Sequence, residues 1–256
     1  MANIVPIRKE QHQNLKLAQA RDLSHVAGQH IIPLTAAEFA QASANFPIVL
    51  VKNPDSEHYR SVAMLGLEAG ENLFYQDDKW TAVSIPQSIS MVPFSLGIDP
   101  EKEKTLIACV DLDSKFVGED KELALFEDDG KESEVLVKVQ QALGRLYDHE
   151  KMTEKFIKEL QENDLLQELE LNIALSTGEK KKLVGIFTIN EEKVKKLSDA
   201  KVLDFHKRGL FVPIYSMLGS ISQVNRLVQL RNQTSENKVT GVQIAPVVDN
   251  AAANDS

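Results

Sequence analysis

The sequence has one cysteine, Cys109, and one tryptophan among its 256 residues. One thiol cannot form an intramolecular disulfide, so a packed core must hold the fold in place of covalent bridges. Cys109 lies in an apolar run typical of a strand, where a thiol acts as a small hydrophobic group and not as a nucleophile. The scarcity of cysteine excludes the class of small disulfide-rich secreted proteins.

Long apolar runs are also lacking. No stretch approaches the roughly 18 apolar residues that are needed to span a bilayer. The first residues, 1–8, lead into a polar segment and not into the apolar core of a secretory signal. We therefore expect a cytoplasmic protein with no segment inserted in a membrane.

Basic residues are outnumbered, with 29 Lys and Arg against 38 Asp and Glu, which gives a formal net charge of −9. A field of this sign repels phosphate backbones, so nucleic acid is not an expected partner. The densest basic run, residues 180–182, follows Thr177 and Gly178 in a segment typical of a hairpin turn. A solvated turn is the simpler interpretation of this run, and an anion site is the alternative.

The composition is that of a globular protein, with 43% hydrophobic and 26% charged residues. The length is sufficient to bury a core in one large domain or in two small ones that share an interface. We expect a globular region over residues 1–232, with a possible boundary near 127–134, where composition and hydrophobic period both change. The polar remainder, residues 233–256, is expected to be a disordered tail.

The first half of the globular region has the pattern of short strands and turns. Residues 46–51 form a continuous apolar run typical of a central strand, and residues 59–67 follow as its hairpin partner. Residues 72–80 carry a turn-prone Asp-Asp pair between aromatic residues. The two prolines of residues 85–94 favour an edge strand or a shaped loop there. Thr35 and Glu38 have the spacing of a capping box, which predicts a short helix beginning there.

The second half is dominated by helical periodicity. Apolar residues recur at intervals of three and four over residues 135–160, which predicts one long helix, or two joined near Asp148. Residues 165–175 and 183–189 alternate as the two strands of a hairpin. The two patterns place a long helix between two regions of sheet.

The C-terminal part indicates further helices. Asn190 precedes a segment with carboxylates in its first turn, which is typical of a helix N-cap. Residues 210–230 are largely helical in pattern after Pro213. The prediction for the whole chain is an α+β fold, with mainly antiparallel sheets, a long central helix and a helical C-terminal part.

Packing and turn residues dispersed over residues 5–231 carry a family resemblance. They are Pro33-Leu34, Glu38-Phe39 and residues 46–49, then Trp80, Ile85-Pro86 and Pro93-Phe94, and finally residues 183–193, residues 203–210 and Ile214-Tyr215. In these segments the chain resembles the bacterial SapC family. Where that family has Tyr-x-His-Leu, this chain has Tyr-Ser-Met-Leu at 215–218, so no histidine role carries over there.

The resemblance implies a non-enzymatic binding or accessory protein. Such proteins are associated with a bacterial surface layer or envelope, or with systems for peptide or small-molecule uptake and modification. The resemblance supplies no catalytic residue. A purely structural role in a surface layer is a third hypothesis, against which the lack of an export signal weighs.

An aromatic and proline-bearing stretch is the candidate region for a protein, peptide or small-molecule partner. Trp and Tyr combine an apolar body with a polar tip, and prolines reduce the entropy lost on docking. The same residue types are also ordinary core residues, so a packing role is the alternative. The candidate binding residues, which include two from the C-terminal part, are Phe74, Tyr75, Trp80, Pro86, Met91, Phe94, His206 and Tyr215.

No catalytic or metal-binding set is visible in the sequence. The 6 histidines are scattered, without the paired spacing or the cysteine cluster that a zinc site needs. No glycine-rich phosphate loop or nucleophile elbow occurs, so no cofactor is expected. His206, close to Asp204, is the best candidate for the alternative function, an enzyme or enzyme-coupled component with a dispersed acid–base site.

Overall fold

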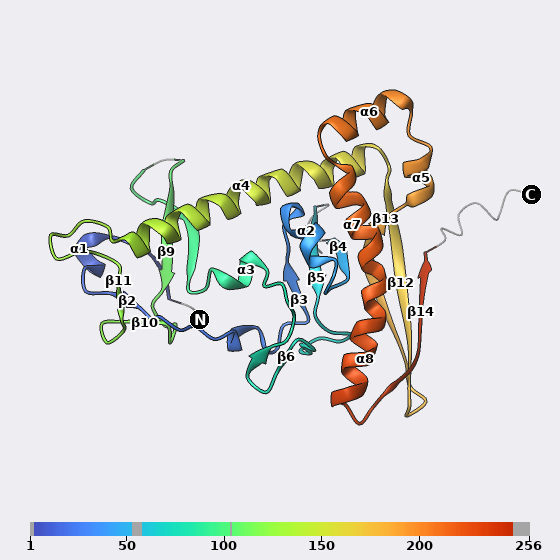
Figure 1. Ribbon diagram of the computed structural model, residues 1–256, viewed down its shortest axis with the longest axis horizontal. Helices are drawn as coiled ribbons and strands as arrows, with labels where there is room; N and C mark the ends of the chain where they lie inside the picture. Colours follow the sequence, from blue (N-terminus) through green and yellow to red (C-terminus); the bar gives the residue numbers. More distant parts are fainter. Residues whose placement is uncertain (1–2, 53–57, 103, 248–256) are drawn as a thin grey trace, which may run out of the picture. The chain divides into compact units, whose positions relative to one another are not determined.

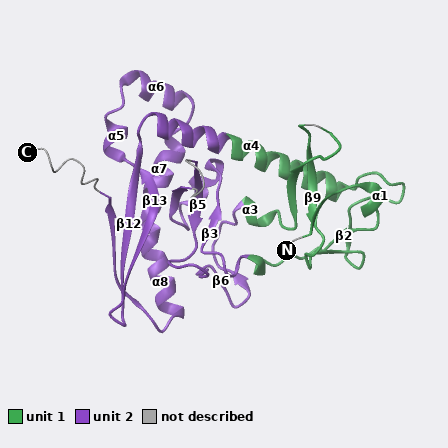
Figure 2. Cartoon of the chain, turned by 180° about the vertical axis from the view of Figure 1, so that it is seen from behind, with its two compact units in different colours: residues 1–25, 87–151 green, residues 26–86, 152–256 purple. Residues whose placement is uncertain are grey.

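The computed structural model describes residues 3–52, 58–102 and 104–247 (Figure 1). The chain divides into two compact units, and each unit is assembled from two separate segments (Figure 2). Unit 1 comprises residues 1–25 and 87–151, and unit 2 comprises residues 26–86 and 152–256. The change of pattern near 127–134 marks the start of the long helix, and this start lies inside the second segment of unit 1.

Unit 1 contains two small antiparallel sheets, with strand orders β1-β9-β8 and β10-β2-β11. Its elements are β1 (Ile4–Pro6), α1 (Lys9–His12), β2 (Lys16–Leu17), α3 (Gln87–Ser90), β8 (Phe94–Ile98), β9 (Leu106–Asp111), β10 (Val117–Gly118) and β11 (Leu123–Ala124). Pairing of Val5 with Val110 joins its two chain segments. The core includes Phe94, Val110 and Leu136.

The long helix is a single element, α4 (Glu134–Glu162), which confirms the prediction and decides against a break near Asp148. The hydroxyl of Ser133 accepts a hydrogen bond from the backbone N–H of Leu136 at 3.3 Å, which satisfies one of the free donors of the first turn. α4 and the short 3-10 turn η1 (Ser24–Val26) both run from one unit into the other. Among the described residues, no helix combines the length and the apolar composition needed to cross a bilayer.

Unit 2 is built on a six-stranded sheet with the order β14-β12-β13-β4-β5-β3, in which all neighbouring strands are antiparallel. The strands are β3 (Ile31–Pro33), β4 (Ile48–Lys52), β5 (Tyr59–Met64), β12 (Leu166–Leu175), β13 (Lys180–Ile189) and β14 (Val239–Pro246), and a small hairpin is formed by β6 (Tyr75–Gln76) and β7 (Lys79–Trp80). The predicted central strand is β4, which pairs with β13 on one side and β5 on the other.

Helices of unit 2 cover part of this sheet. They are η2 (Ala36–Glu38), α2 (Phe39–Ala42), α5 (Glu191–Lys195), α6 (Asp199–Lys207), α7 (Phe211–Ser220), η3 (Ile221–Gln223) and α8 (Val224–Thr234). α7 contacts β13 and β4, and α8 contacts β14. Along β12 the odd-numbered residues Leu169, Leu171, Ile173 and Leu175 are buried, while the residues between them are half-buried. This alternation is the sequence signature of a sheet with one covered face.

Local sequence signals fix several element ends as predicted. Thr35 and Glu38 form the capping box at the start of η2. Asn190 accepts a hydrogen bond from the backbone N–H of Lys193 at 3.0 Å at the start of α5. The predicted Asp-Asp turn joins β6 to β7, and both of its residues have positive φ, 49° and 60°, as a tight two-residue hairpin requires.

β13 contains one extra residue relative to its partner β12. Leu169 pairs with Ile186, but Leu171 pairs with Leu183, so Val184 and Gly185 occupy the place of one residue. Gly185 has a φ of 73°, which side chains rarely tolerate. The result is a β-bulge that keeps Leu183 and Ile186 on the same face of the sheet.

Three expectations differ from the structure. The tail expected from residue 233 is wrong for residues 239–246, because β14 pairs with β12 over most of its length; residues 248–256 lie outside the described part. The basic run 180–182 begins β13 and does not form the turn. Residues 85–94, expected as an edge strand or shaped loop, contain the short helix α3 before β8 begins at Phe94.

Candidate functional site

An apolar depression of about 260 Å³ lies on one face of the unit 2 sheet. The strand register places the side chains of Ile31 and Met64 on that face as one pair, and those of Val51 and Ile186 as another. Val49, two residues before Val51, points the same way. The residues that line the depression are His30, Ile31, Val49, Val51, Met64, Gly66, Leu67, Glu68, Ala69, Leu183, Val184, Gly185 and Ile186.

The floor of the depression is buried and its edge is open. Val49 and Met64 are only 2% and 4% exposed, whereas Val184 on the edge is 62% exposed. Val184 is held outward by the bulge in β13. An apolar side chain of a partner could therefore contact a rigid hydrocarbon floor while its attached chain stays in solvent.

The wall formed by residues 66–71 is held in place by α8. Arg231, which is 5% exposed, donates hydrogen bonds to Glu68 at 2.9 Å and to Glu71 at 3.0 Å. Glu71 also accepts a hydrogen bond from the backbone N–H of Leu67 at 2.7 Å. Gly66 is required here because a Cβ at this position would lie 2.2 Å from the backbone oxygen of Glu71.

Charge is confined to the rim of the depression. Lys181 donates a hydrogen bond to Glu68 at 2.5 Å, and this bond, followed by the one from Arg231, lowers the pKa of Glu68 below its ordinary value. The same contact raises the pKa of Lys181. Glu68 is therefore a carboxylate paired on two sides, which makes it a structural part of the wall and a poor proton donor near neutral pH.

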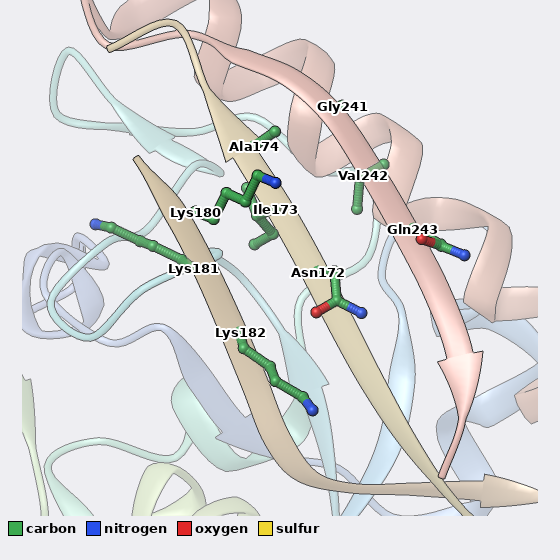
Figure 3. Close-up of a pocket in the computed structure, with 9 residues that line it drawn as sticks. All are labelled: Asn172, Ile173, Ala174, Lys180, Lys181, Lys182, Gly241, Val242 and Gln243. Carbon is green, nitrogen blue, oxygen red and sulfur yellow. The ribbon is translucent and has the colours of Figure 1, made fainter. Parts of the chain in front are cut away.

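A second, more open hollow of about 470 Å³ lies over the strands β12, β13 and β14 (Figure 3). Figure 3 shows its lining side chains: Asn172, Ile173 and Ala174 from β12, Lys180, Lys181 and Lys182 from β13, and Gly241, Val242 and Gln243 from β14. Lys182 forms an ion pair with Glu170 at 2.5 Å, and Lys181 pairs with Glu68. These two pairs compensate much of the positive charge that suggested an anion site.

Two of the predicted aromatic residues of unit 2, Phe74 and Trp80, lie in one ring cluster with Phe46. Phe74 is fully buried, and its ring lies 4.8 Å from that of Phe46 and 6.2 Å from that of Trp80. The indole N–H of Trp80 is satisfied by the backbone oxygen of Ser84 at 3.0 Å. These rings gather as a packed cluster, which is the alternative that the sequence left open.

The other predicted residues of the aromatic stretch are dispersed. Pro86 is buried and Tyr75 is half-buried in unit 2. Phe94 is 5% exposed in the core of unit 1, and Met91 packs against that core. Phe74, Pro86 and Phe94 are each buried within their own unit, which fits a packing role.

His206 and Tyr215 lie on exposed helix faces of unit 2. His206 is exposed on α6, outside the two hollows described above. Asp204 accepts a hydrogen bond from Arg208 at 2.9 Å, so its carboxylate is engaged in an ion pair. Tyr215 is 51% exposed on α7 and its ring stacks on that of Phe211 at 6.1 Å.

The residues that line the depression were missed as a site because each belongs to a plain strand pattern. Their only signal is the shared face of Ile31, Val49, Val51, Met64 and Ile186, which depends on the register between four strands. Among the residues described, no group of three or more His, Cys, Asp or Glu side chains could hold a metal ion. The site thus offers an apolar surface with a neutralised rim.

The fold and this site define an α+β protein with an apolar depression on an antiparallel sheet. The chain matches the SapC family model over residues 7–227, and it therefore belongs to the SapC family. The match covers the strand residues of the depression and ends at residue 227, within α8 and before Arg231. No curated protein and no solved structure shows significant similarity to the chain.

Proposed function

We propose that this chain is a non-enzymatic binding protein of the SapC type, which receives an apolar group of a peptide or small-molecule partner in the depression of unit 2. The observation that carries the proposal is the apolar floor formed by Val49, Val51, Met64 and Ile186, which is reached from the open edge at Val184. Binding sites of this kind are mostly apolar, with a few polar groups at the rim. His30 and Glu68 supply such groups here.

The size of the depression limits what it can hold. A cavity of about 150 Å³ is enough for benzene, so about 260 Å³ accommodates one aromatic ring system or a branched alkyl group. Burial of about 150 Å² of apolar surface is worth about 4 kcal/mol, which corresponds to a dissociation constant of about 1 mM. A physiological partner must therefore add contacts outside the depression, as a peptide does through its backbone.

Association with the bacterial envelope, or with uptake and modification systems, is part of the same proposal and rests on the family. A cytoplasmic location is also proposed. It is supported by Cys109, a buried thiol in a sequence with no second cysteine, because such a protein gains no stability from an oxidising compartment.

Indole is a suitable probe, because its two fused rings match the volume of the depression. We expect its titration to shift the NMR signals of the methyl groups of Val49, Val51 and Met64 in the full chain. Val51→Phe places a ring in the depression and should weaken indole binding at least about tenfold, since it removes most of the available apolar contact. Val202→Phe, at an exposed position of α6, is the matched control and should leave binding unchanged.

Equal binding of indole to wild type and Val51→Phe would contradict the proposal. So would shifts confined to methyl groups away from the depression. Thermal unfolding of both variants in the absence of indole shows whether either substitution has altered the fold.

A further inference from the structure

β14 is the outermost strand of the unit 2 sheet, and no strand among the described residues pairs with its outer side. Figure 1 and Figure 2 both show it at the edge of the sheet, beside β12. An open edge presents a row of backbone donors and acceptors to any chain that can extend the sheet. The edge of β14 is therefore open to strand pairing, and it is separate from the apolar depression.

The hydrogen-bond pattern shows which backbone groups face outward. The N–H of Val247 donates to the backbone oxygen of Glu168 at 2.9 Å, so residue 247 bonds toward β12. Antiparallel pairs alternate between bonded and non-bonded positions, so Ala245 and Gln243 also bond inward, opposite Glu170 and Asn172. The N–H and C=O groups of the residues between them, Val242 and Ile244, point away from the sheet.

At both ends of this open edge, the backbone groups are not available for pairing with another strand. At one end, the side chain of Asn232 donates to the backbone oxygen of Val239 at 2.9 Å and accepts from its N–H at 2.7 Å. At the other end stands Pro246, which has no N–H to donate. Between them lies a short window, residues 240–245, whose centre is Val242 to Ile244.

The window has no charged side chain to protect it as an edge strand. Natural edges carry charged side chains, especially lysine, that prevent pairing with another copy. Residues 239–246, Val-Thr-Gly-Val-Gln-Ile-Ala-Pro, contain no charge, although 26% of the whole chain is charged. Two such strands can therefore approach each other without charge repulsion between their side chains. The acidic residues that give the chain its net charge lie outside this strand.

The geometry points to self-association: β14 pairs antiparallel with β14 of a second copy, about a two-fold axis at Gln243. In this register Val242 of each copy lies opposite Ile244 of the other, and each such pair exchanges two backbone hydrogen bonds. The two Val242–Ile244 pairs need no hydrogen-bond donor from Pro246. They also need no bond from Thr240, which lies next to the register shift between β14 and β12 at Leu175. The interface is isologous, as two-fold pairing requires.

The side chains are compatible with this arrangement on both faces. Gln243 and its symmetry mate lie opposite each other on the exposed face, where two amides can exchange hydrogen bonds. Gly241 lies opposite Ala245 of the other copy, so the neighbouring positions are small. On the other face the β-branched side chains of Val242 and Ile244 meet, which is a favourable cross-strand pair.

Single-cysteine variants of the full chain test this register. Gln243→Cys should form a disulfide-linked dimer on mild oxidation, because the two Cα atoms of such a non-bonded pair lie about 4.5 Å apart. Gly241→Cys and Ala245→Cys should not crosslink alone, because each lies about 14 Å from its own symmetry mate, but a mixture of the two should crosslink. Wild type should stay uncrosslinked because Cys109 is buried.

Sedimentation equilibrium supplies the second measurement. We expect a concentration-dependent dimer of wild type below about 1 mM, and Val242→Pro should raise its dissociation constant at least about tenfold by removing one outward donor from each copy. The native inward bonds survive because the N–H of Val242 is not used within the sheet. Circular dichroism verifies that Val242→Pro stays folded.

A wild-type chain that is monomeric at these concentrations, with no crosslinking of Gln243→Cys, overturns the inference. A dimer that Val242→Pro leaves unchanged, or that crosslinks equally through all three cysteines, also overturns it, because the contact then lies elsewhere. A third outcome is that the chain stays monomeric and Gln243→Cys forms a disulfide with an added extended peptide that carries a cysteine. That result assigns the edge to peptide binding and excludes self-pairing.

Discussion

Arg231 on α8 binds Glu71 through its Nη1 atom at 3.0 Å, across 160 positions of sequence. The guanidinium side chain is 6% exposed and the carboxylate side chain is 17% exposed. This contact fastens the wall of the apolar depression to the C-terminal helix. The stability of the wall therefore depends on a residue that does not line the depression itself.

Arg231→Met should lower the free energy of unfolding by about 2 kcal/mol, because Glu68 and Glu71 lose hydrogen bonds between charged groups. Chemical denaturation measures this loss. Arg208→Met is the matched control: Arg208 pairs with Asp204 and Glu159 on the surface, where such pairs are worth about 0 to 1 kcal/mol. Equal losses in the two variants would show that the contact with Glu71 has no special role.

The contribution of Glu68 should depend on pH. Its pKa is lowered in the folded protein, first by Lys181 and then by Arg231, from an ordinary value of 4.5. A carboxyl group with a lowered pKa stabilises the fold above the ordinary value, and this stabilisation is lost as the pH falls through the lowered one. The difference in unfolding free energy between wild type and Glu68→Gln should therefore be constant near neutral pH and shrink below about pH 4.5. A difference that grows on acidification would contradict the assignment.

Two glycine substitutions should have opposite effects. Gly66→Ala places a Cβ against the backbone of Glu71 and should cost about 1 to 3 kcal/mol of stability, because backbone atoms cannot move aside freely. Gly144→Ala in α4 meets no atom within 4 Å and should stabilise the protein by up to about 1 kcal/mol, since alanine favours helix. Thermal unfolding distinguishes the two, and a stable Gly66→Ala would mean that the wall is not tightly packed.

His25 should make unit 1 sensitive to mild acid. Its pKa is lowered from 6.5 chiefly by burial, against a smaller opposing effect from a hydrogen bond with the backbone of Ile89. The unfolded chain then binds a proton more readily than the folded one, so stability falls as the pH drops below about 6.5. Melting temperatures at pH 7.5 and 5.5 should differ less in His25→Gln than in wild type. An unchanged difference would exclude His25 as its source.

Phe74→Ala should destabilise the chain by about 3 to 5 kcal/mol, because the ring is fully buried in the cluster with Phe46 and Trp80. Val83→Ala is the control, since Val83 is 89% exposed and should change stability by less than about 0.5 kcal/mol. A small effect of Phe74→Ala on denaturant unfolding would argue that the ring is free to serve a partner.

Short-range signals in the sequence were sufficient for several element ends. The capping box of Thr35 with Glu38 and the N-cap Asn190 depend on neighbours within three residues, and both form as predicted. The family resemblance is confirmed as well. β14 was missed because its pattern is weak in isolation, and pairing with β12 stabilises it as a strand.

The division into units and the depression could not be predicted in the same way. Unit 1 depends on the pairing of β1 with β9, which joins Ile4 to Asp111. The depression depends on the register that sets Ile186 beside Val51. Both are long-range relationships that no local pattern specifies, and the burial of Phe74 and Phe94 depends on contacts of the same kind.

The bulge at Val184 and Gly185 affects how homologous chains should be compared. Because the additional residue is looped out locally, the pairs on either side, Leu169 with Ile186 and Leu171 with Leu183, keep their partners. A relative that lacks one residue here can preserve every other cross-strand neighbour. Alignments of the family should therefore permit a single gap at this point, and length variation there carries no implication of a different fold.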